Sequence, residues 1–229
     1  MTEAVAPTTD PARTSTWHMY RAMVGIGIGC GILIVGVFQA TLPRIERNKA
    51  EALQAAIFQV LPAATTSKTF AYKAPEGFSA VEGEVRDVPL VYAGYDDQSN
   101  LVGVAVEAQG MGYQDVIRLI YGYSFEEQAI IGIQVLESKE TPGLGDKIET
   151  DPDFLANFER LDVSLKTDDA GLAHAVVAVR NGEKEHPWEV DGITGATISS
   201  VAIAAILNGS ADNWAPRIQQ GLSQLQGGE

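Results

Sequence analysis

A ten-residue segment near the C-terminus, residues 191–200, has the composition of a site for a phosphate group. It consists of Asp-Gly-Ile-Thr-Gly-Ala-Thr-Ile-Ser-Ser and leads into a run of Val, Ile, Ala and Leu that is typical of a helix. Unpaired amides and the positive end of the helix dipole gather at such a helix start. Gly192 and Gly195 allow close backbone approach. Four hydroxyls can cap the helix or contact an anion: Thr194, Thr197, Ser199 and Ser200. An ordinary capped helix start fits the same residues, and composition alone leaves both interpretations open.

Other reactive residue types do not form a site in the sequence. Three histidines are scattered without the spacing of metal ligands: His18, His174 and His186. Cys30 is the only cysteine and lies in an apolar run, so this chain can form neither an internal disulfide nor a cysteine-held cluster. No Gly-x-Ser-x-Gly context surrounds Ser199 or Ser200, which favours helix caps over nucleophiles.

Residues 22–43 predict one membrane-spanning helix, preceded by a tail over residues 1–21. The run contains no Asp, Glu, Lys or Arg and is flanked by Arg21 and Arg44. At about 1.5 Å per residue it reaches roughly 30 Å, the thickness of the hydrocarbon layer. A cleaved signal peptide has an apolar region of only about 7–15 residues that ends in a small-residue cleavage site. No such site follows Phe38, so we expect a retained single-pass anchor in membrane lipid.

The net charge lies entirely after the membrane segment. The chain has a formal charge of −14, and the acidic and basic residues before the anchor cancel. So acidic a surface repels phosphate backbones, which excludes nucleic acid as an expected partner and favours proteins with basic or mixed faces. Basic residues flank the anchor on both sides, so the positive-inside rule does not decide its orientation.

Beyond the anchor the sequence predicts an amphipathic stalk helix over residues 44–66 and one domain over residues 67–229. Six short β-rich runs are separated by turn residues: 68–73, 78–85, 90–95, 101–109, 116–123 and 129–137. The last two are joined at hairpin spacing, so the expected fold class is α+β, a mostly antiparallel sheet flanked by helices. Four elements are predicted after the sheet: a short helix near 152–160, a strand at 174–180, a helix after residue 196 and an amphipathic stretch near 214–225.

Two separate segments resemble one known family. Residues 191–197 resemble the flavinylation motif Asp-x-x-Ser/Thr-Gly-Ala-Ser/Thr of FMN-binding domains in the Rnf and sodium-pumping NADH:quinone oxidoreductase complexes. Residues 140–148, Glu-Thr-Pro-Gly-Leu-Gly-Asp-Lys-Ile, resemble the segment that lies beside the flavin in these domains. Both motifs occur in the family's order behind one anchor, and the similarity is closest to the G subunits of Rnf complexes. Gln114 and Asp115 depart from the Ser-Gly expected after a Gly-Tyr pair, which puts the flavin contact of that loop in question.

The resemblance implies FMN bound covalently, through a phosphoester, to the side-chain oxygen of Thr197, with Asp191 as the leading acid of the motif. It also implies seven further cofactor-binding residues: Thr194, Gly195, Ala196, Glu140, Thr141, Leu144 and Gly145. Negative groups near the ring disfavour the anionic reduced flavin, so Glu140 and Asp146 are candidates for tuning its potential. The alternative is that Glu140 and Asp146 are ordinary loop acids exposed to solvent, without a role in tuning. No catalytic residue and no metal ligand is implied.

The resemblance further implies an electron carrier in a membrane complex that couples electron transfer between ferredoxin and NAD to ion translocation. Its partners would be the A, B, C, D and E subunits of the Rnf complex, and a flavin transferase that attaches FMN. The domain would lie on the periplasmic or outer side of the bacterial inner membrane. Two alternatives remain: the FMN subunit of a sodium-pumping NADH:quinone reductase, for which the chain is short, and an anchored ectodomain without redox function.

Overall fold

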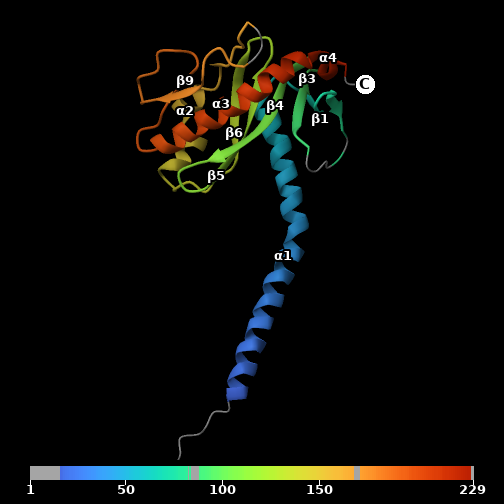
Figure 1. Ribbon diagram of the computed structural model, residues 1–229, viewed down its shortest axis with the longest axis vertical. Coiled ribbons are helices and arrows are strands. Elements are labelled where there is room, and N and C mark those ends of the chain that lie inside the picture. Colours follow the sequence, from blue (N-terminus) through green and yellow to red (C-terminus); the bar gives the residue numbers. More distant parts are fainter. Residues whose placement is uncertain (1–15, 82, 84–87, 168–170, 228–229) are drawn as a thin grey trace, which may run out of the picture. The chain divides into compact units, whose positions relative to one another are not determined.

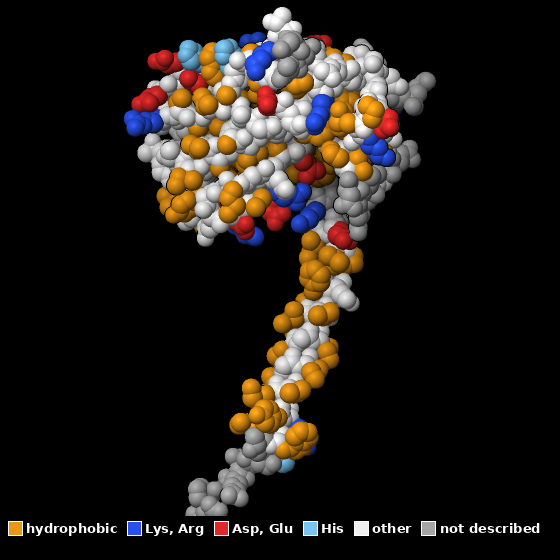
Figure 2. Space-filling model, viewed as in Figure 1, with side chains coloured by type: hydrophobic (Ala, Val, Ile, Leu, Met, Phe, Trp, Pro, Cys, Tyr) orange, Lys and Arg blue, Asp and Glu red, His pale blue; other side chains and the backbone are white. Residues whose placement is uncertain are grey.

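A computed structural model describes residues 16–81, 83, 88–167 and 171–227, and the chain divides into two compact units, Met1–Ala50 and Glu51–Glu229. Helix α1 (Thr16–Val60) continues unbroken through Pro43, so the predicted anchor and most of the predicted stalk are parts of one helix, while residues 61–66 of that stalk lie beyond its end. Within the first unit its large apolar side chains are exposed, as Figure 2 shows, with Ile26 at 68% and Leu33 at 66%. Among the described residues this is the one helix long and apolar enough to cross a membrane. Such an exposed apolar surface requires lipid, so the chain has a transmembrane helix.

The second unit is built on a seven-stranded sheet in the order β2-β1-β3-β4-β5-β6-β7. Every neighbouring pair in this sheet is antiparallel, as expected from the short runs at hairpin spacing. Its strands are β1 (Thr66–Lys73), β2 (Gly77–Ala80), β3 (Leu90–Tyr95), β4 (Leu101–Met111), β5 (Val116–Ser124), β6 (Ala129–Glu137) and β7 (Leu161–Asp162). The α+β fold class and the mostly antiparallel sheet are confirmed.

The sheet is covered on both faces, which explains why its central strands are apolar at successive positions. On one face, Val104 of β4 and Leu119 of β5 pack in a core cluster with helix α3 (Thr197–Gln220). On the other face, Ala105 and Ile120 pack with residues from the last turns of α1. Neighbouring strand residues therefore point into different layers, as the period of two requires. Figure 1 shows α3 crossing the strands of this unit.

Glycines in the strands allow the end of α1 to lie close to the sheet. A Cβ built at Gly103 would lie 2.7 Å from Leu61 Cδ2, and one built at Gly122 would overlap the Val60 carbonyl oxygen. Strand interiors usually avoid glycine unless another backbone approaches closely, which is the case here. In the sequence these glycines are ordinary members of β-rich runs, since their partner lies far away along the chain.

Several predicted elements differ in extent from the structure. The strand expected at 78–85 ends at Ala80, and positions 82, 84 and 85 lie outside the described residues. The strand expected at 174–180 is only β8 (Val177–Val179), which pairs in parallel with β9 (Glu189–Asp191) in a separate two-stranded sheet. The helix near 152–160 is α2 (Pro152–Ala156), and a short 3-10 helix η1 (Gly145–Glu149) precedes it.

The amphipathic stretch expected near 214–225 is not one element. Helix α3 runs from Thr197 through Pro216 to Gln220, and a short helix α4 (Leu222–Gln226) follows Gly221. The buried side of α3 continues through Trp214, Ala215 and Ile218, so packing against the sheet extends the helix past the proline. The predicted stretch therefore forms the C-terminal part of α3 and the short helix α4, because burial of the apolar face of α3 outweighs the hydrogen bond that Pro216 cannot donate.

Replacing Gly122 by alanine should destabilise the second unit. The new Cβ would collide with the Val60 carbonyl group, which cannot move without shifting the end of α1. Such overpacking lowers the free energy of unfolding by about 1–3 kcal/mol. Chemical unfolding of the full chain in detergent, followed by tryptophan fluorescence, measures this. The control is Gly209→Ala in α3, where nothing lies within 4 Å of the new Cβ; it should leave stability unchanged or raise it by up to about 1 kcal/mol. Equal stability of the two variants would refute this packing argument.

Candidate functional site

The two motif segments meet around one cavity in the second unit, although residues 149–190 separate them in the chain. The cavity measures about 370 Å³, within the range of roughly 300–1,000 Å³ that small-molecule sites occupy. It is lined by Tyr113, Glu140, Thr141, Leu144, Gly145, Gly195, Ala196, Thr197, Ile198 and Ser199. All the residues predicted to bind the cofactor line this motif cavity except Thr194. Thr194 instead lines a second hollow on the other side of the turn. Gly195 and Thr197 line both hollows, and Arg180 also lines the second one.

The turn before α3 presents Thr197 at the mouth of the motif cavity. Gly195 has a φ of +87°, a conformation that L-residues with a side chain rarely adopt, and the turn closes where the Ala196 amide donates to the Ile193 carbonyl oxygen at 3.0 Å. Thr197 is then the first residue of the helix and is exposed. Its hydroxyl makes no hydrogen bond to any described residue, so it is available for chemistry.

Helix α3 begins without a side-chain cap. The N-cap position is Ala196, which has no polar side chain, and no side chain accepts from the first amides. Within the described part of the chain, the amides of Thr197 and Ile198 find no acceptor. Orphan amides at a helix start attract anions, and the positive end of the helix dipole adds to this attraction. This site can therefore hold a phosphate group next to the Thr197 hydroxyl.

The two serines that were expected to cap the helix instead hold the turn and the cavity wall. The Ser200 hydroxyl accepts from the Ile193 amide at 3.1 Å and donates to the Ala196 carbonyl oxygen at 3.0 Å. Ser199 donates to Glu140 Oε2 at 2.5 Å. Both serines are buried, so the expectation of caps was wrong. Their side chains point into the protein because they lie on the packed face of α3.

Asn157 holds the strand that leads into the motif, a role that no pattern in the sequence indicated. Its Oδ1 accepts from the Asp191 amide at 2.9 Å, and its Nδ2 donates to the Asp191 carbonyl oxygen at 3.2 Å. Lys184 Nζ also donates to Asn157 Oδ1 at 3.1 Å, and burial lowers the pKa of Lys184. The Asp191 carboxylate accepts from the Gly182 amide at 2.7 Å. The leading acid of the motif therefore shapes the β8–β9 connection and does not reach the motif cavity.

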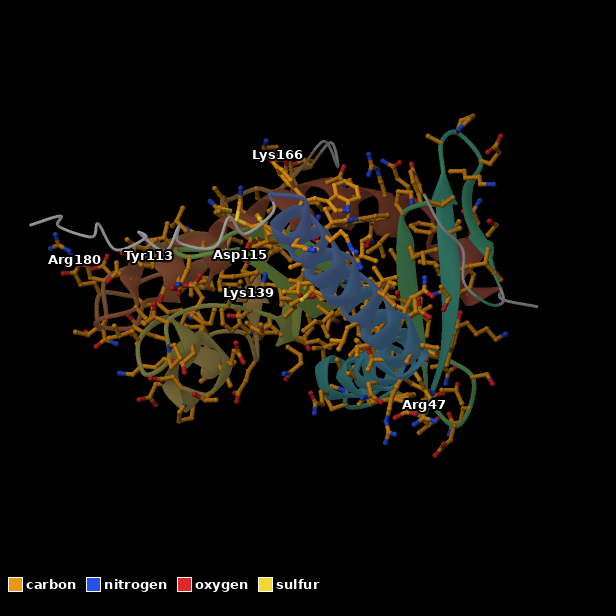
Figure 3. The ribbon with its side chains drawn as sticks, turned by 90° about the horizontal axis from the view of Figure 1, so that it is seen from below. Arg47, Tyr113, Asp115, Lys139, Lys166 and Arg180 are labelled. Carbon is orange, nitrogen blue, oxygen red and sulfur yellow. The ribbon has the colours of Figure 1, made fainter. Side chains whose placement is uncertain are left out.

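The loop after β4 contributes to the motif cavity despite its departure from the family pattern. Tyr113 lines the cavity and is 64% exposed. Gln114 accepts from the Thr141 hydroxyl at 3.2 Å, which ties this loop to the second motif. Asp115 forms an ion pair with Lys139 at 2.6 Å, and this hydrogen bond lowers the pKa of Asp115. Figure 3 shows Asp115 next to Lys139, with Tyr113 farther along the same end of the domain.

The two acids expected to tune the cofactor occupy different places. Glu140 lines the motif cavity and is only 5% exposed. Asp146 is not among the lining residues, and its Oδ1 is buried without a hydrogen-bond partner among the described residues. Of the two, only Glu140 is placed to act on a group in the cavity.

The histidines of the domain belong to an aromatic stack. His174 and His186 both stack on Trp188, with ring centroids 3.8 Å and 4.6 Å apart. Over the described ranges, no three His, Cys, Asp or Glu side chains gather where they could hold a metal ion. The motif cavity offers the unbonded hydroxyl of Thr197, open amides at the start of α3, and an exposed apolar rim of Tyr113, Leu144 and Ile198. That combination suits a planar aromatic molecule that carries a phosphate.

Comparison with known proteins agrees with this chemistry. Residues 112–212 match the FMN-binding domain family. The chain is 33% identical over 190 residues to the G subunit of the ion-translocating oxidoreductase complex of Methanosarcina acetivorans, covering 83% of this chain and 89% of that one. It is also 33% identical to the G subunit of the corresponding complex of Escherichia coli K12, covering 84% and 87%.

A solved structure shares the fold. The crystal structure of the C subunit of the Na⁺-translocating NADH-quinone reductase from Parabacteroides distasonis has a TM-score of 0.58 and 18% identity, covering 76% of this chain and 96% of that one. An identity this low supports the fold alone. The family is shown by the relatives named as G subunits, which are similar over most of their length, and by the match to the FMN-binding domain. This chain belongs to the G-subunit family of ion-translocating oxidoreductase complexes and carries an FMN-binding domain.

Proposed function

We propose that this chain is the electron-carrier subunit of a membrane-bound ion-translocating oxidoreductase and relays electrons through FMN joined by a phosphoester to Thr197. The observation that carries this proposal is the free, exposed hydroxyl of Thr197 on the uncapped first turn of α3, at the edge of a cavity lined by both motifs. Membership in the family indicates that the cofactor is FMN, and the geometry of the helix start favours Thr197 as its point of attachment.

The residues present fit the FMN phosphate. Attachment at the Thr197 oxygen would place the phosphate beside the amides of Thr197 and Ile198, which have no other acceptor among the described residues. Arg180 lines the hollow on the other side of Thr197 and offers a positive charge there, which it shares with Glu183 of the same hollow at 3.9 Å. The apolar rim of the motif cavity favours an aromatic ring over bulk water. These groups bind and orient the cofactor, while FMN supplies the redox chemistry when bound.

Covalent attachment serves retention of the cofactor. A flavin that exchanges electrons with successive partners outside the cytoplasm would be lost if it were held only by modest affinity in a cavity as open as this one. A phosphoester holds the cofactor while leaving its ring chemically unmodified. A separate flavin transferase would attach FMN, as the family resemblance implies.

Among redox complexes we favour an Rnf-type complex, which couples electron transfer between ferredoxin and NAD to ion translocation. Relatives over most of this chain are named as G subunits, while the likeness to the C subunit of the quinone reductase concerns the fold. The partners would be the A, B, C, D and E subunits, and the domain would lie on the periplasmic or outer side of the inner membrane. The main alternative of another class is an anchored ectodomain without flavin, against which the free Thr197 hydroxyl argues.

The attachment point is tested by changing Thr197. Co-expression of the wild-type chain with a flavin transferase should add the mass of FMN less one water, visible by intact-protein mass spectrometry and by flavin fluorescence in a denaturing gel. Thr197→Ala should lose both signals, because no hydroxyl remains at that position. Thr66→Ala, at an exposed position of β1 outside both motifs, removes a threonine hydroxyl elsewhere and is the control that should keep both signals. An unmodified wild-type chain, with the transferase active on a known acceptor, would remove this proposal.

Weakening the turn before α3 should also reduce the attachment of FMN to Thr197. Ser200→Ala leaves the buried Ile193 amide without its acceptor, which costs about 1–3 kcal/mol of unfolding free energy. Because the same bond shapes the turn, the fraction of chains carrying FMN after a fixed transferase reaction should fall as well. Ser79→Ala, at an exposed position of β2, serves as the control. Unchanged stability together with unchanged FMN content in Ser200→Ala would show that this bond does not hold the turn.

A further inference from the structure

Glu140 is a buried carboxylate without a cation. Its side chain is 5% exposed, and no Lys, Arg or His pairs with it in the part of the chain that the structure describes. The adjacent Lys139 is committed to Asp115 at 2.6 Å. A buried charge without a counter-charge costs free energy unless hydrogen bonds compensate it. Its presence beside the motif cavity therefore requires an explanation.

Neutral donors from two segments hold this carboxylate. Oε1 accepts from the Gln114 amide at 3.0 Å, and Oε2 accepts from the Ser199 hydroxyl at 2.5 Å. Ser199 is the third residue of α3, so the carboxylate also lies by the positive end of the helix dipole. An ionised carboxylate accepts hydrogen bonds and donates none, which matches both partners.

The surrounding backbone is shaped around the two carboxylate oxygens. A Cβ at Gly112 would lie 2.5 Å from Glu140 Oε1, and one at Gly145 would lie 2.6 Å from Oε2 and 2.8 Å from the Ser199 hydroxyl oxygen. Glycine at both positions therefore leaves the space that the carboxylate fills. The side chain is held in one place by contacts from three directions, so its charge is fixed relative to Thr197.

We propose that Glu140 is a positioning residue whose fixed negative charge lowers the reduction potential of the flavin in the motif cavity. This inference rests on the proposed function, because it requires FMN at Thr197. Accepting electrons adds negative charge to the isoalloxazine ring, and a nearby carboxylate in a partly desolvated site opposes that addition. Glutamine would keep the acceptor for the Gln114 amide and reverse the direction of the bond to Ser199, so it removes the charge at nearly the same size and shape.

The experiment compares flavin potentials in three variants of the full chain loaded with FMN. Glu140→Gln removes the charge and keeps an acceptor for the Gln114 amide and a donor for the Ser199 oxygen. Ser199→Ala keeps the charge but removes a donor that offsets it. Glu76→Gln removes an exposed acid on the β1–β2 turn and is the control for net charge. Intact mass first establishes FMN on each chain, and spectroelectrochemical titration then gives each midpoint potential. Thermal melting of the FMN-free chains tests the fold.

The expected result is a higher potential in Glu140→Gln than in wild type, with Glu76→Gln unchanged and Ser199→Ala unchanged or lower. An unchanged potential in Glu140→Gln overturns the inference, and so does a rise in Ser199→Ala, since that would make geometry the cause. If Glu140→Gln fails to fold or to take FMN, the direction in which Ser199→Ala shifts the midpoint potential still tests the inference. A wild-type chain without FMN would instead overturn the proposed function, which the mass measurement separates from failure of this inference.

Discussion

The first turn of α3 leaves its amides without a cap while its position is fixed by other bonds. A helix start is usually secured by a capping side chain, but such a side chain would occupy the amides that the proposed phosphate would use. Here the N-cap is Ala196, and the turn is held by two hydrogen bonds on its buried side. The Ser200 hydroxyl accepts from the Ile193 amide and donates to the Ala196 carbonyl oxygen. Asn157 secures the incoming strand in the same way, through both backbone polar groups of Asp191. The rest of the site depends on this arrangement.

The layers of the domain provide the rigid background for that turn. Helix α3 packs along one face of the sheet, and the last turns of α1 cover the other face through the close approach that strand glycines allow. The motif cavity then forms at the start of α3, where the loop after β4 and the segment before η1 converge. Glu140 connects these two loops to α3, so one carboxylate both joins the walls and sets the charge of the cavity.

Much of the fold could be predicted because it depends on local patterns. The uncharged apolar run predicted a transmembrane helix, and the β-rich runs with turn residues between them predicted the antiparallel sheet. Element ends were less predictable: packing carried α3 past Pro216, and the short strands β8 and β9 left the main sheet. The family followed from the resemblance of two motifs to known FMN-binding domains, because residue types alone fit an ordinary capped helix start equally well.

By itself, the sequence determined the membrane helix, the fold class, the family and the residues of both motifs. Only the tertiary structure decided what the side chains of those motifs contact. The sequence pattern favoured Ser199 and Ser200 as caps, yet they face inward to Glu140 and to the turn. Glu140 and Ser199 lie 59 residues apart, and Asn157 lies 34 residues before Asp191. Such pairs depend on how loops and helix meet across the packed layers, and spacing along the chain carries no information about a contact that packing creates.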